Sequence, residues 1–166
     1  MIIRAARPED YPSLKHIAEV KFGKDFAGED QFFENGLLCL VAEIDGTVVA
    51  YATACIVDSE TKSHLEEYFD GKTGLLSSLA VLPEFERRKI GTMLAKERVK
   101  RLKEVGCDSV IATAWRSEEG GVHVGKILDR LGFKPIDELL KYWEGNDCVF
   151  CGDYCTCDAV VYKLKF

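Results

Sequence analysis

The distribution of hydrophobic and polar residues along the chain predicts a mixed α/β protein. Segments with the spacing expected of strands lie at residues 1–6, 37–44, 47–57, 74–82, 108–114, 134–143 and 159–166. Apolar residues recur at helical spacing in residues 7–22, 88–105 and 121–131, and residues 24–35 fit either a short helix or a loop. Between the second and third strands, Asp45 and Gly46 predict a tight hairpin turn, because glycine readily adopts the positive φ that such a turn needs.

The strand at 74–82 is expected to lie in the middle of the sheet. Both of its faces are uncharged, with one face formed by Leu75, Ser77, Leu79 and Val81 and the other by Leu76, Ser78, Ala80 and Leu82. Pro83 ends this strand, and the following helix is expected to begin near Arg88 and to end at Gly106. Together with the strand at 108–114, this helix predicts a right-handed βαβ unit within a mixed sheet that carries helices on its faces.

Positive charge is concentrated just after this strand, although the whole chain has a formal charge of −6. Between residues 87 and 103 the only acid is Glu97, whereas the basic residues are Arg87, Arg88, Lys89, Lys96, Arg98, Lys100, Arg101 and Lys103. Anions bind at helix N-termini, because the first-turn amides lack intrahelical partners and carry partial positive charge. We therefore expect residues 87–92 to bind a phosphate-bearing cofactor, whereas Lys96, Arg98, Lys100 and Lys103 are explained more simply as a solvated helix face.

Length and composition are those of a single globular domain. The chain has 166 residues, of which 47% are hydrophobic and 30% are charged. No apolar run approaches the roughly 20 residues needed to span a bilayer, and charges appear too early at the N-terminus for a signal peptide. We therefore expect a cytoplasmic protein. Its net negative charge argues against general binding of nucleic acid, although the basic helix keeps a local patch as an alternative.

Four of the seven cysteines cluster near the C-terminus, at Cys148, Cys151, Cys155 and Cys157. The other three, Cys39, Cys55 and Cys107, border apolar segments and are expected to be small buried hydrophobic groups. Four thiolates complete a tetrahedral Zn²⁺ site with no open position, so a structural zinc is the favoured interpretation of the cluster. The single residue between its last two members is less usual than a second CxxC pair. Disulfides and an iron–sulfur cluster remain less favoured alternatives.

The order of elements and several motifs resemble the GCN5-related N-acetyltransferase (GNAT) superfamily. The similarity extends over essentially the whole length, from MIIRAARPEDYPSL through LAVLPEFERRKIGTML to DRLGFKP. Family members of this type carry a hydrophobic residue, Val, any residue, Pro, Glu and an aromatic residue, then a Gln/Arg-x-x-Gly-x-Gly/Ala loop and a helix. The residues that fit this frame are Leu79, Val81, Pro83, Glu84, Phe85, Ile90 and Gly91.

This resemblance implies a GNAT fold, in which a central, mixed, mostly antiparallel twisted sheet is flanked by helices on both faces. Residues 1–166 would form one such domain, with the cysteine knuckle at 148–157 between the last two strands. Acetyl-CoA would be the cosubstrate. Backbone groups of Leu79, Ala80 and Val81 would pair with its pantetheine arm, and its pyrophosphate would be bound by the amides of Arg87, Arg88, Lys89, Ile90, Gly91 and Thr92.

The loop departs from the family pattern at two positions. Glu86 stands where Gln or Arg is usual, and Lys89 replaces the first glycine. Lys89 is compatible with the loop only if its backbone is not in a glycine-only conformation, in which case its ammonium group could pair with a phosphate. Glu86 has to point away from the phosphates.

The catalytic groups that many family members use, a Glu on the central strand and a Tyr on the following helix, are replaced in this chain. Ser77 and Ser78 occupy the strand positions, and Leu128 occupies the helix position. A base or a water chain is still expected, because the acceptor amine must be neutral to attack the thioester. The candidate substitutes are His123, Ser117, Glu66, Glu67 and Asp70, each explained better as a capping or solvated residue. We therefore assign no catalytic residue from the sequence.

Three functions are compatible with these features. The favoured one is acetyl transfer from acetyl-CoA to a primary amine of a small molecule or a protein. The second is a catalytically silent acyl-CoA-binding sensor or regulatory protein, because the usual Glu and Tyr are missing. The third is a zinc-knuckle protein whose basic helix contacts RNA or DNA. This interpretation is the weakest, because binding of the CoA phosphates explains the same basic residues. No membrane partner is expected, and a homodimer is an open alternative.

Overall fold

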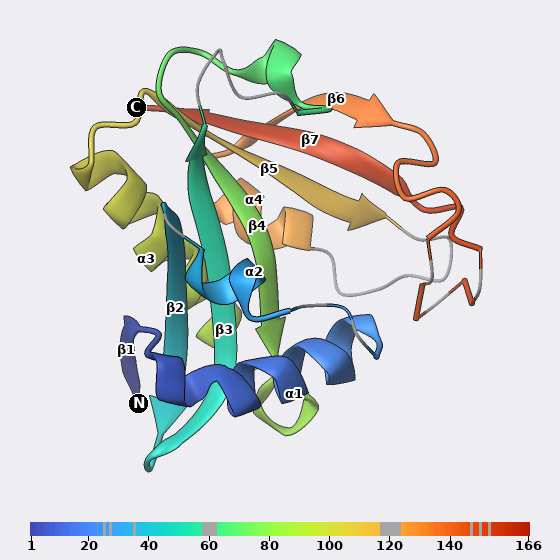
Figure 1. Cartoon of the computed structure of the whole chain (residues 1–166). Coiled ribbons are helices and arrows are strands. Elements are labelled where there is room, and N and C mark those ends of the chain that lie inside the picture. The colour runs from blue at the N-terminus through green and yellow to red at the C-terminus, as the bar shows by residue number, and fades with distance from the viewer. Residues whose placement is uncertain are drawn as a thin grey trace.

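In a computed structural model of the chain, the described residues form a seven-stranded sheet with helices on both faces (Figure 1). The structure describes residues 1–24, 26, 28–34, 36–57, 63–116, 124–146, 148–149, 151–152 and 154–166. The strands are β1 (Ile2–Ala5), β2 (Leu37–Ile44), β3 (Thr47–Val57), β4 (Thr73–Val81), β5 (Ser109–Arg116), β6 (Lys134–Leu139) and β7 (Asp158–Lys165). The α-helices are α1 (Tyr11–Phe22), α2 (Asp30–Phe33), α3 (Ile90–Glu104) and α4 (Val124–Arg130), and the 3₁₀ turns are η1 (Pro8–Asp10), η2 (Glu66–Tyr68) and η3 (Pro83–Phe85).

The strands lie in the order β1-β2-β3-β4-β5-β7-β6, so β4 is the central strand of the sheet, as its uncharged faces predict. All neighbouring strands are antiparallel except β4 and β5, which are parallel and are connected through α3. The expected mixed, mostly antiparallel sheet is therefore confirmed. Among the described residues, no helix is both long enough and apolar enough to cross a membrane.

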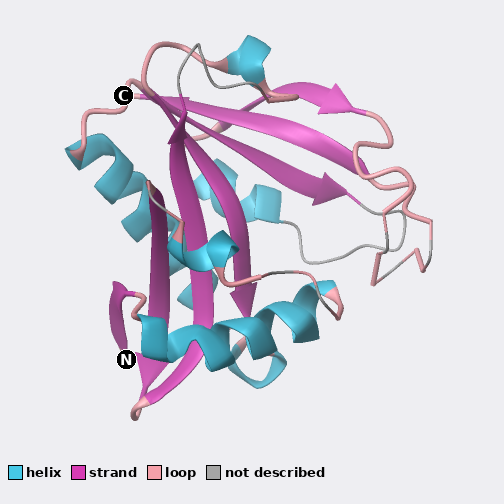
Figure 2. Cartoon of the chain, in the orientation of Figure 1, coloured by secondary structure: helices cyan, strands magenta, loops and turns pink. Residues whose placement is uncertain are grey.

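Each face of the sheet is covered by its own pair of helices (Figure 2). On one face, α1 contributes the fully buried Leu14 and Ile17, and Phe32 of α2 packs edge-to-face on Tyr51 of β3, with 5.2 Å between the ring centroids. On the other face, α3 and α4 bury side chains that include Leu94, Leu102 and Leu128. The apolar spacing that predicted these helices therefore marks the stripe that each one turns toward the sheet.

β4 and β5 pair along only part of their length. Their parallel register runs from Thr73, opposite Ser109, to Leu76, opposite Ala112. β4 then continues to pair with β3 as far as Val81, while β5 turns toward β7, and the two strands diverge in Figure 1. An irregularity in the pairing of β3 with β4, between Ala52 and Ala54, lies at the level of this separation. In the described residues, the edge of β4 that faces β5 therefore has no strand partner from residue 77 onward.

Several element boundaries differ from those expected. The helix predicted from about Arg88 begins at Ile90 in the structure, because Arg87 and Lys89 have positive φ values of 58° and 64°. The strand predicted to reach Trp143 ends at Leu139, shortly before Lys141 with a φ of 50°. Within the predicted helix or loop at 24–35, the described helix is α2, and of the helix predicted at 121–131 the structure describes the part from residue 124.

Candidate active site

The N-terminus of α3 lies just beyond the open end of β4 and has no side-chain cap. Its N-cap residue is Lys89, whose side chain accepts no amide hydrogen bond, and the bond that closes the first turn runs from Met93 N to Lys89 O at 3.0 Å. The amides of Ile90, Gly91 and Thr92 precede this bond and lack an intrahelical acceptor. These amides are therefore available to an anion at the positive end of a 15-residue helix.

The turn before α3 supports the same chemistry. Arg87 and Lys89 have left-handed backbone conformations, and such residues within a turn direct successive N–H groups to one side. Lys89 (φ 64°, ψ 8°) lies in the left-handed helical region, which a residue with a side chain can adopt at some cost, and so avoids a glycine-only conformation. Arg88 is folded against the turn: its Nη2 donates to Glu84 O at 3.1 Å, and its guanidinium lies 5.1 Å from the Phe85 ring centroid.

Glu86 does not add negative charge to this site. Its carboxylate forms an ion pair with Lys21, in the last turn of α1. This contact neutralises the carboxylate and connects the turn to the helix on the opposite face of the sheet. The expectation that Glu86 points away from a bound phosphate is consistent with this pairing.

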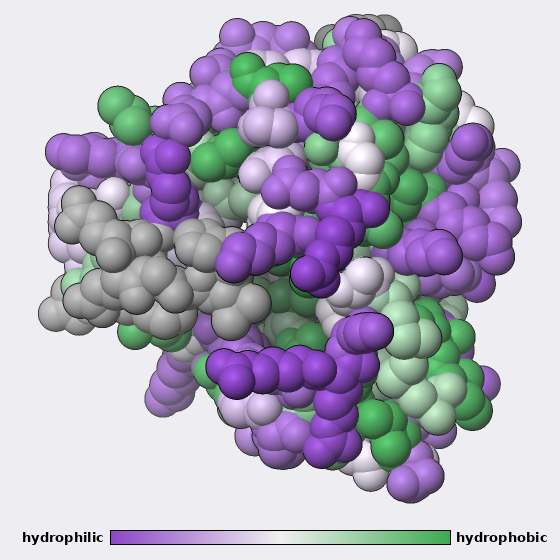
Figure 3. Space-filling view, turned by 180° about the vertical axis from the view of Figure 1, so that it is seen from behind, coloured by the Kyte–Doolittle hydropathy of each residue, from purple (hydrophilic) through white to green (hydrophobic). Residues whose placement is uncertain are grey.

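Gly91 allows the first turn of α3 to lie close to β4 and α4. A Cβ atom placed on Gly91 would lie 3.4 Å from Leu79 Cδ2, 3.6 Å from Ile127 Cδ1 and 3.8 Å from Val81 Cγ2. The first turn of α3 therefore packs directly on the side chains of Leu79 and Val81 in β4. Seen from this side, the surface contains a hollow with a hydrophobic floor between hydrophilic rims (Figure 3).

The serines at the usual catalytic positions take different roles in the structure. The Ser77 residue is exposed, whereas Ser78 Oγ lies 2.9 Å from Thr53 Oγ1 on β3, and the Ser78 amide donates to the same oxygen at 3.1 Å. Leu128 is buried in the core beneath α4. The positions where the family carries Glu and Tyr therefore hold structural or exposed groups that are poor acids and bases.

Of the substitutes considered from the sequence, His123 and Ser117 lie outside the described residues. Glu66 and Glu67 are exposed in η2, which precedes β4. Asp70 is 2.6 Å from Lys163 Nζ and 2.9 Å from Lys165 Nζ, and these ammonium groups lower its pKa to about 2. Such a carboxylate is a weak base, and it lies near the start of β4, at the end of the strand remote from the N-terminus of α3.

Arg98, predicted to lie on a solvated face of α3, is instead buried, with 3% of its surface exposed. Its Nη1 donates to Thr53 O at 2.7 Å and to Ser78 O at 3.3 Å, at the irregular pairing of β3 with β4. Burial lowers the pKa of Arg98 to about 10, so the side chain is still charged at neutral pH. Its role is to satisfy two carbonyl groups where the strand ladder is interrupted.

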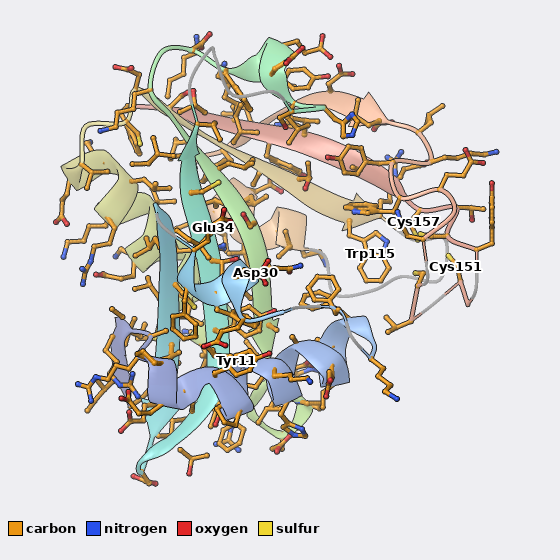
Figure 4. All side chains as sticks on the ribbon, in the orientation of Figure 1. Tyr11, Asp30, Glu34, Trp115, Cys151 and Cys157 are labelled. Carbon is orange, nitrogen blue, oxygen red and sulfur yellow. The ribbon has the colours of Figure 1, made fainter. Side chains whose placement is uncertain are left out.

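An acidic pocket lies on the face of the sheet opposite α3, beside α2. Its volume is about 510 Å³, and its lining residues are Glu29, Asp30, Phe33 and Glu34. The labelled Asp30 and Glu34 lie in front of β3 and β4 (Figure 4). Burial raises the pKa of the Cys55 thiol on β3, a hydrogen bond with Ser77 opposes this rise, and the charge of Glu34 adds to it. Glu34 and Ser77 therefore both act on the Cys55 thiol, near the level at which β4 and β5 separate.

The sequence did not identify this acidic pocket. Its residues come from the segment that fits either a short helix or a loop, and acids in such a segment are usually solvated. Only the fold places α2 over the centre of the sheet. No local pattern in residues 29–34 indicates that placement.

The four clustered cysteines are brought together by the connection between β6 and β7. Their Sγ atoms all lie within 4.8 Å of one another. Cys155 and Cys157 are buried, Cys148 is half-buried and Cys151 is exposed. Cys148 and Gly152 form two backbone hydrogen bonds of 2.8 Å, in a turn for which Gly152 supplies a φ of 83°. This arrangement has the ligand number of a closed metal site.

Comparisons with known proteins agree with this architecture. The family model described as "Acetyltransferase (GNAT) family" matches residues 3–133. An N-alpha-acetyltransferase from Sulfurisphaera tokodaii is 32% identical over 149 residues, which cover 88% of this chain and 79% of that protein.

Solved structures show the same fold at low sequence identity. Arabidopsis thaliana NAA60 in complex with a bisubstrate analogue has a TM-score of 0.78 at 16% identity, covering 99% of this chain and 97% of that chain. The ribosomal-protein-S18-alanine N-acetyltransferase from Escherichia coli has a TM-score of 0.72 at 18% identity, covering 99% and 92%. The Arabidopsis protein in complex with acetyl-CoA has a TM-score of 0.76 at 17% identity, covering 99% and 98%.

Proposed function

Because the chain belongs to the GNAT family of acetyltransferases, we propose that it transfers the acetyl group of acetyl-CoA to the N-terminal α-amine of a protein. One observation carries the cofactor part of this proposal: β4 separates from β5 and leads directly to the uncapped, basic N-terminus of α3. A strand edge without a partner offers backbone groups to an amide-bearing chain, and the helix end offers amides to a pyrophosphate. Acetyl-CoA contains both.

In this proposal, the cofactor site consists of the residues expected from the resemblance. Backbone groups of residues 79–81 bind the pantetheine arm, and the amides of residues 87–92 bind the pyrophosphate. The exposed side chains of Arg87 and Lys89 stand beside those amides and add positive charge. The thioester then lies near Ser77, because that is where the free edge of β4 begins.

The acceptor binds from the opposite face of the sheet, at the acidic pocket beside α2. An α-amine arrives as an ammonium ion, which the carboxylates of Asp30 and Glu34 attract. The charge of Glu34 acts on Cys55, the thiol that Ser77 also influences, so we infer that Glu34 removes the proton, directly or through water. The neutral amine attacks the thioester carbonyl, a C–N bond forms, and the C–S bond breaks to release CoA as a thiol after protonation.

A protein N-terminus is favoured over a small amine for two reasons. The relative from Sulfurisphaera tokodaii carries the name N-alpha-acetyltransferase and aligns with 88% of this chain. The acidic pocket also lies on the surface beside α2 and not in an enclosed cavity, so the remainder of a peptide can extend from it into solvent.

The acceptor class is tested by incubating the full chain and acetyl-CoA with matched substrates. The substrates are a short peptide with a free N-terminus, the same peptide with a blocked N-terminus and an internal lysine, and spermidine. Mass spectrometry is expected to detect acetylation of the free N-terminus only. Transfer confined to lysine or to spermidine would overturn the proposed acceptor. Binding of acetyl-CoA without transfer to any amine would instead favour the catalytically silent sensor, which the serines at positions 77 and 78 keep as the second candidate.

The role of Glu34 is tested by Glu34→Gln. If Glu34 is the base, kcat falls by about 10²-fold or more, while the affinity for acetyl-CoA stays unchanged. Glu104→Gln, which removes an exposed carboxylate from the far end of α3, is the matched control and should retain full activity. An unchanged kcat in Glu34→Gln would exclude this residue as the base.

A further inference from the structure

We propose that Cys148, Cys151, Cys155 and Cys157 together bind one structural zinc ion, which holds the connection between β6 and β7 against the end of α1. The four sulfur atoms all lie within 4.8 Å of one another. A tetrahedral ion with Zn–S bonds of about 2.3 Å places its sulfur ligands about 3.8 Å apart. To complete a closed shell, separations above 3.8 Å, which reach at most 4.8 Å, have to shorten by up to about 1 Å, and the 3.3 Å between Cys151 Sγ and Cys157 Sγ has to widen slightly.

Backbone geometry around the cluster also suits thiolate ligands. The paired backbone bonds between Cys148 and Gly152 form the tight turn that presents the first two sulfurs. The amide of Cys157 donates to Cys155 Sγ at 3.4 Å, and the backbone of Thr156 favours the thiolate form of Cys151 by lowering the pKa of that thiol. Amide donors of this kind disperse the negative charge that four thiolates bring to one ion.

The same distances argue against the two other uses of four cysteines. Cys151 Sγ and Cys157 Sγ are 3.3 Å apart, whereas a disulfide needs about 2.05 Å, and all seven cysteines of the chain are unpaired. An iron–sulfur cluster holds several iron atoms and sulfides between its ligands, so its cysteine sulfurs have to stand further apart than those around one ion. The compact arrangement favours a single tetrahedral ion.

The cluster is connected to three other parts of the fold. Val149, between the first two cysteines, packs on the residue that ends α1, since a Cβ atom placed on Gly23 would lie 3.6 Å from Val149 Cγ1. Trp115, at the end of β5, lies beside Cys157, and both residues are labelled in Figure 4. Trp143, just after β6, stacks edge-to-face on Trp115 with 6.3 Å between ring centroids. One ion would therefore fix α1, β5 and the β6–β7 connection together.

The first test is the metal content of the purified full chain. Elemental analysis is expected to give one zinc per chain, with Cys151→Ser reduced to less than about half of that. Cys55→Ser, which removes a half-buried thiol outside the cluster, is the control and should keep one zinc. Iron in place of zinc, disulfides detected by mass spectrometry, or a folded chain without metal would each overturn the proposal.

The second test concerns position and does not depend on acetyl transfer. Trp115 and Trp143 are the two tryptophans of the chain, so a shift in tryptophan emission on chelation reports on the cluster. Hydrogen exchange is expected to become faster in residues 19–24 and 140–157 of Cys151→Ser, while β2 and β3 stay unchanged. If zinc is lost and exchange at residues 19–24 does not change, the ion does not hold α1, and that part of the proposal is wrong.

Discussion

At the scale of single residues, Lys89 combines an unfavourable backbone with a useful charge. Its φ of 64° costs a residue with a side chain about 1–2 kcal/mol relative to a right-handed conformation. Glycine, which the family carries there, avoids that cost but has no ammonium group. The chain therefore retains a strained residue beside the proposed phosphate site, and we expect the charge at position 89 to contribute to cofactor binding.

Lys89→Gly separates the two effects. Relief of the strain is opposed by the larger conformational freedom of glycine in the unfolded chain, about 0.4–1 kcal/mol, so the free energy of unfolding should change by less than about 1 kcal/mol. Loss of an exposed ion pair should weaken acetyl-CoA binding by up to about fivefold and reduce its dependence on salt. Denaturant unfolding and calorimetric titration measure the two quantities. Lys96→Ala, at an exposed position further along α3, is the control for affinity.

Arg98 is buried without any carboxylate among its hydrogen-bond partners in the described residues. Replacing a buried ion by an apolar side chain can stabilise a protein, because the desolvation penalty disappears. Here, however, the guanidinium donates to Thr53 O and Ser78 O, at the irregular pairing of β3 with β4. Without Arg98, these two carbonyl groups would lose this hydrogen-bond donor. A buried carbonyl without a donor costs about 1–3 kcal/mol, and this loss should dominate.

Arg98→Met is therefore expected to lower the free energy of unfolding by about 1–3 kcal/mol. Arg101→Met is the matched control, because Arg101 is exposed on the same helix and pairs only with Glu97 in the described residues. Its substitution should change stability by less than about 0.5 kcal/mol. Urea unfolding of both variants gives the comparison. A variant Arg98→Met as stable as the parent would mean that desolvation outweighs the two carbonyl bonds.

Lys89 and Arg98 show which environments of basic residues could be predicted from the sequence and which could not. The basic turn at 87–89 could be predicted from the local sequence, because it lies between a strand that Pro83 ends and the start of the following helix. Arg98 was assigned to the wrong environment because the charge of a residue in a basic helix does not indicate whether it faces solvent. The defect that Arg98 supports arises from the pairing of β3 with β4, a contact between segments distant in sequence.

At the scale of elements, apolar patterning located the strands and helices, and backbone conformation decided their ends. β4 was predicted as central because both of its faces are uncharged, and the strand order confirms this position. The start of α3 and the end of β6 were placed wrongly. α3 begins directly after Lys89 and β6 ends shortly before Lys141. Both lysines have a side chain and a positive φ, and at such residues composition gives no signal. The amide of Lys141 donates to Asp158 Oδ1 at 2.9 Å, which stabilises the turn after β6.

One contact between elements predicts a pH effect. Asp70, shortly before β4, pairs with Lys163 and Lys165 of β7, and its folded-state pKa of about 2 is below the ordinary value of 3.8. A carboxylate with a depressed pKa contributes stability above its unfolded pKa and loses it as pH falls through the folded value. Between about pH 5 and pH 2, the parent chain should therefore lose more stability than Asp70→Asn, which lacks this titration. Unfolding free energies measured across that range give the comparison, and parallel curves would contradict it.

At the scale of the whole molecule, function depends on contacts that no single segment determines. The parallel pairing of β4 with β5 stops at Leu76, and the opening beyond it has the basic end of α3 on one face of the sheet and the acidic α2 on the other. The sequence predicted the first of these, because strand, turn and helix are consecutive. It did not predict the second, because α2 is placed on the sheet by contacts between segments distant in sequence, such as the packing of Phe32 on Tyr51. The proposed cofactor site was therefore predictable, whereas the proposed acceptor site was not.

If acetyl-CoA binds along β4 to the amides of α3, it should stabilise the whole chain. Ligand at 100 times its Kd adds about 2.7 kcal/mol to the free energy of unfolding. For a domain of this size, about 1 kcal/mol corresponds to a Tm increase of about 2–4 °C, so the expected shift is roughly 5–10 °C. Thermal unfolding of the full chain across a concentration series measures it, and the shift should keep growing with the logarithm of ligand concentration.

The variants place this stabilisation at the proposed site. Arg87→Ala combined with Lys89→Gly should reduce the shift at a fixed ligand concentration, whereas Lys96→Ala should leave it unchanged. Raising the ionic strength should weaken binding to the parent more than binding to the double variant, because the parent keeps two more positive charges beside the proposed phosphate site. Absence of any shift in the parent would contradict the cofactor assignment. If the double variant retains the full Tm shift, the phosphates do not bind at the N-terminus of α3.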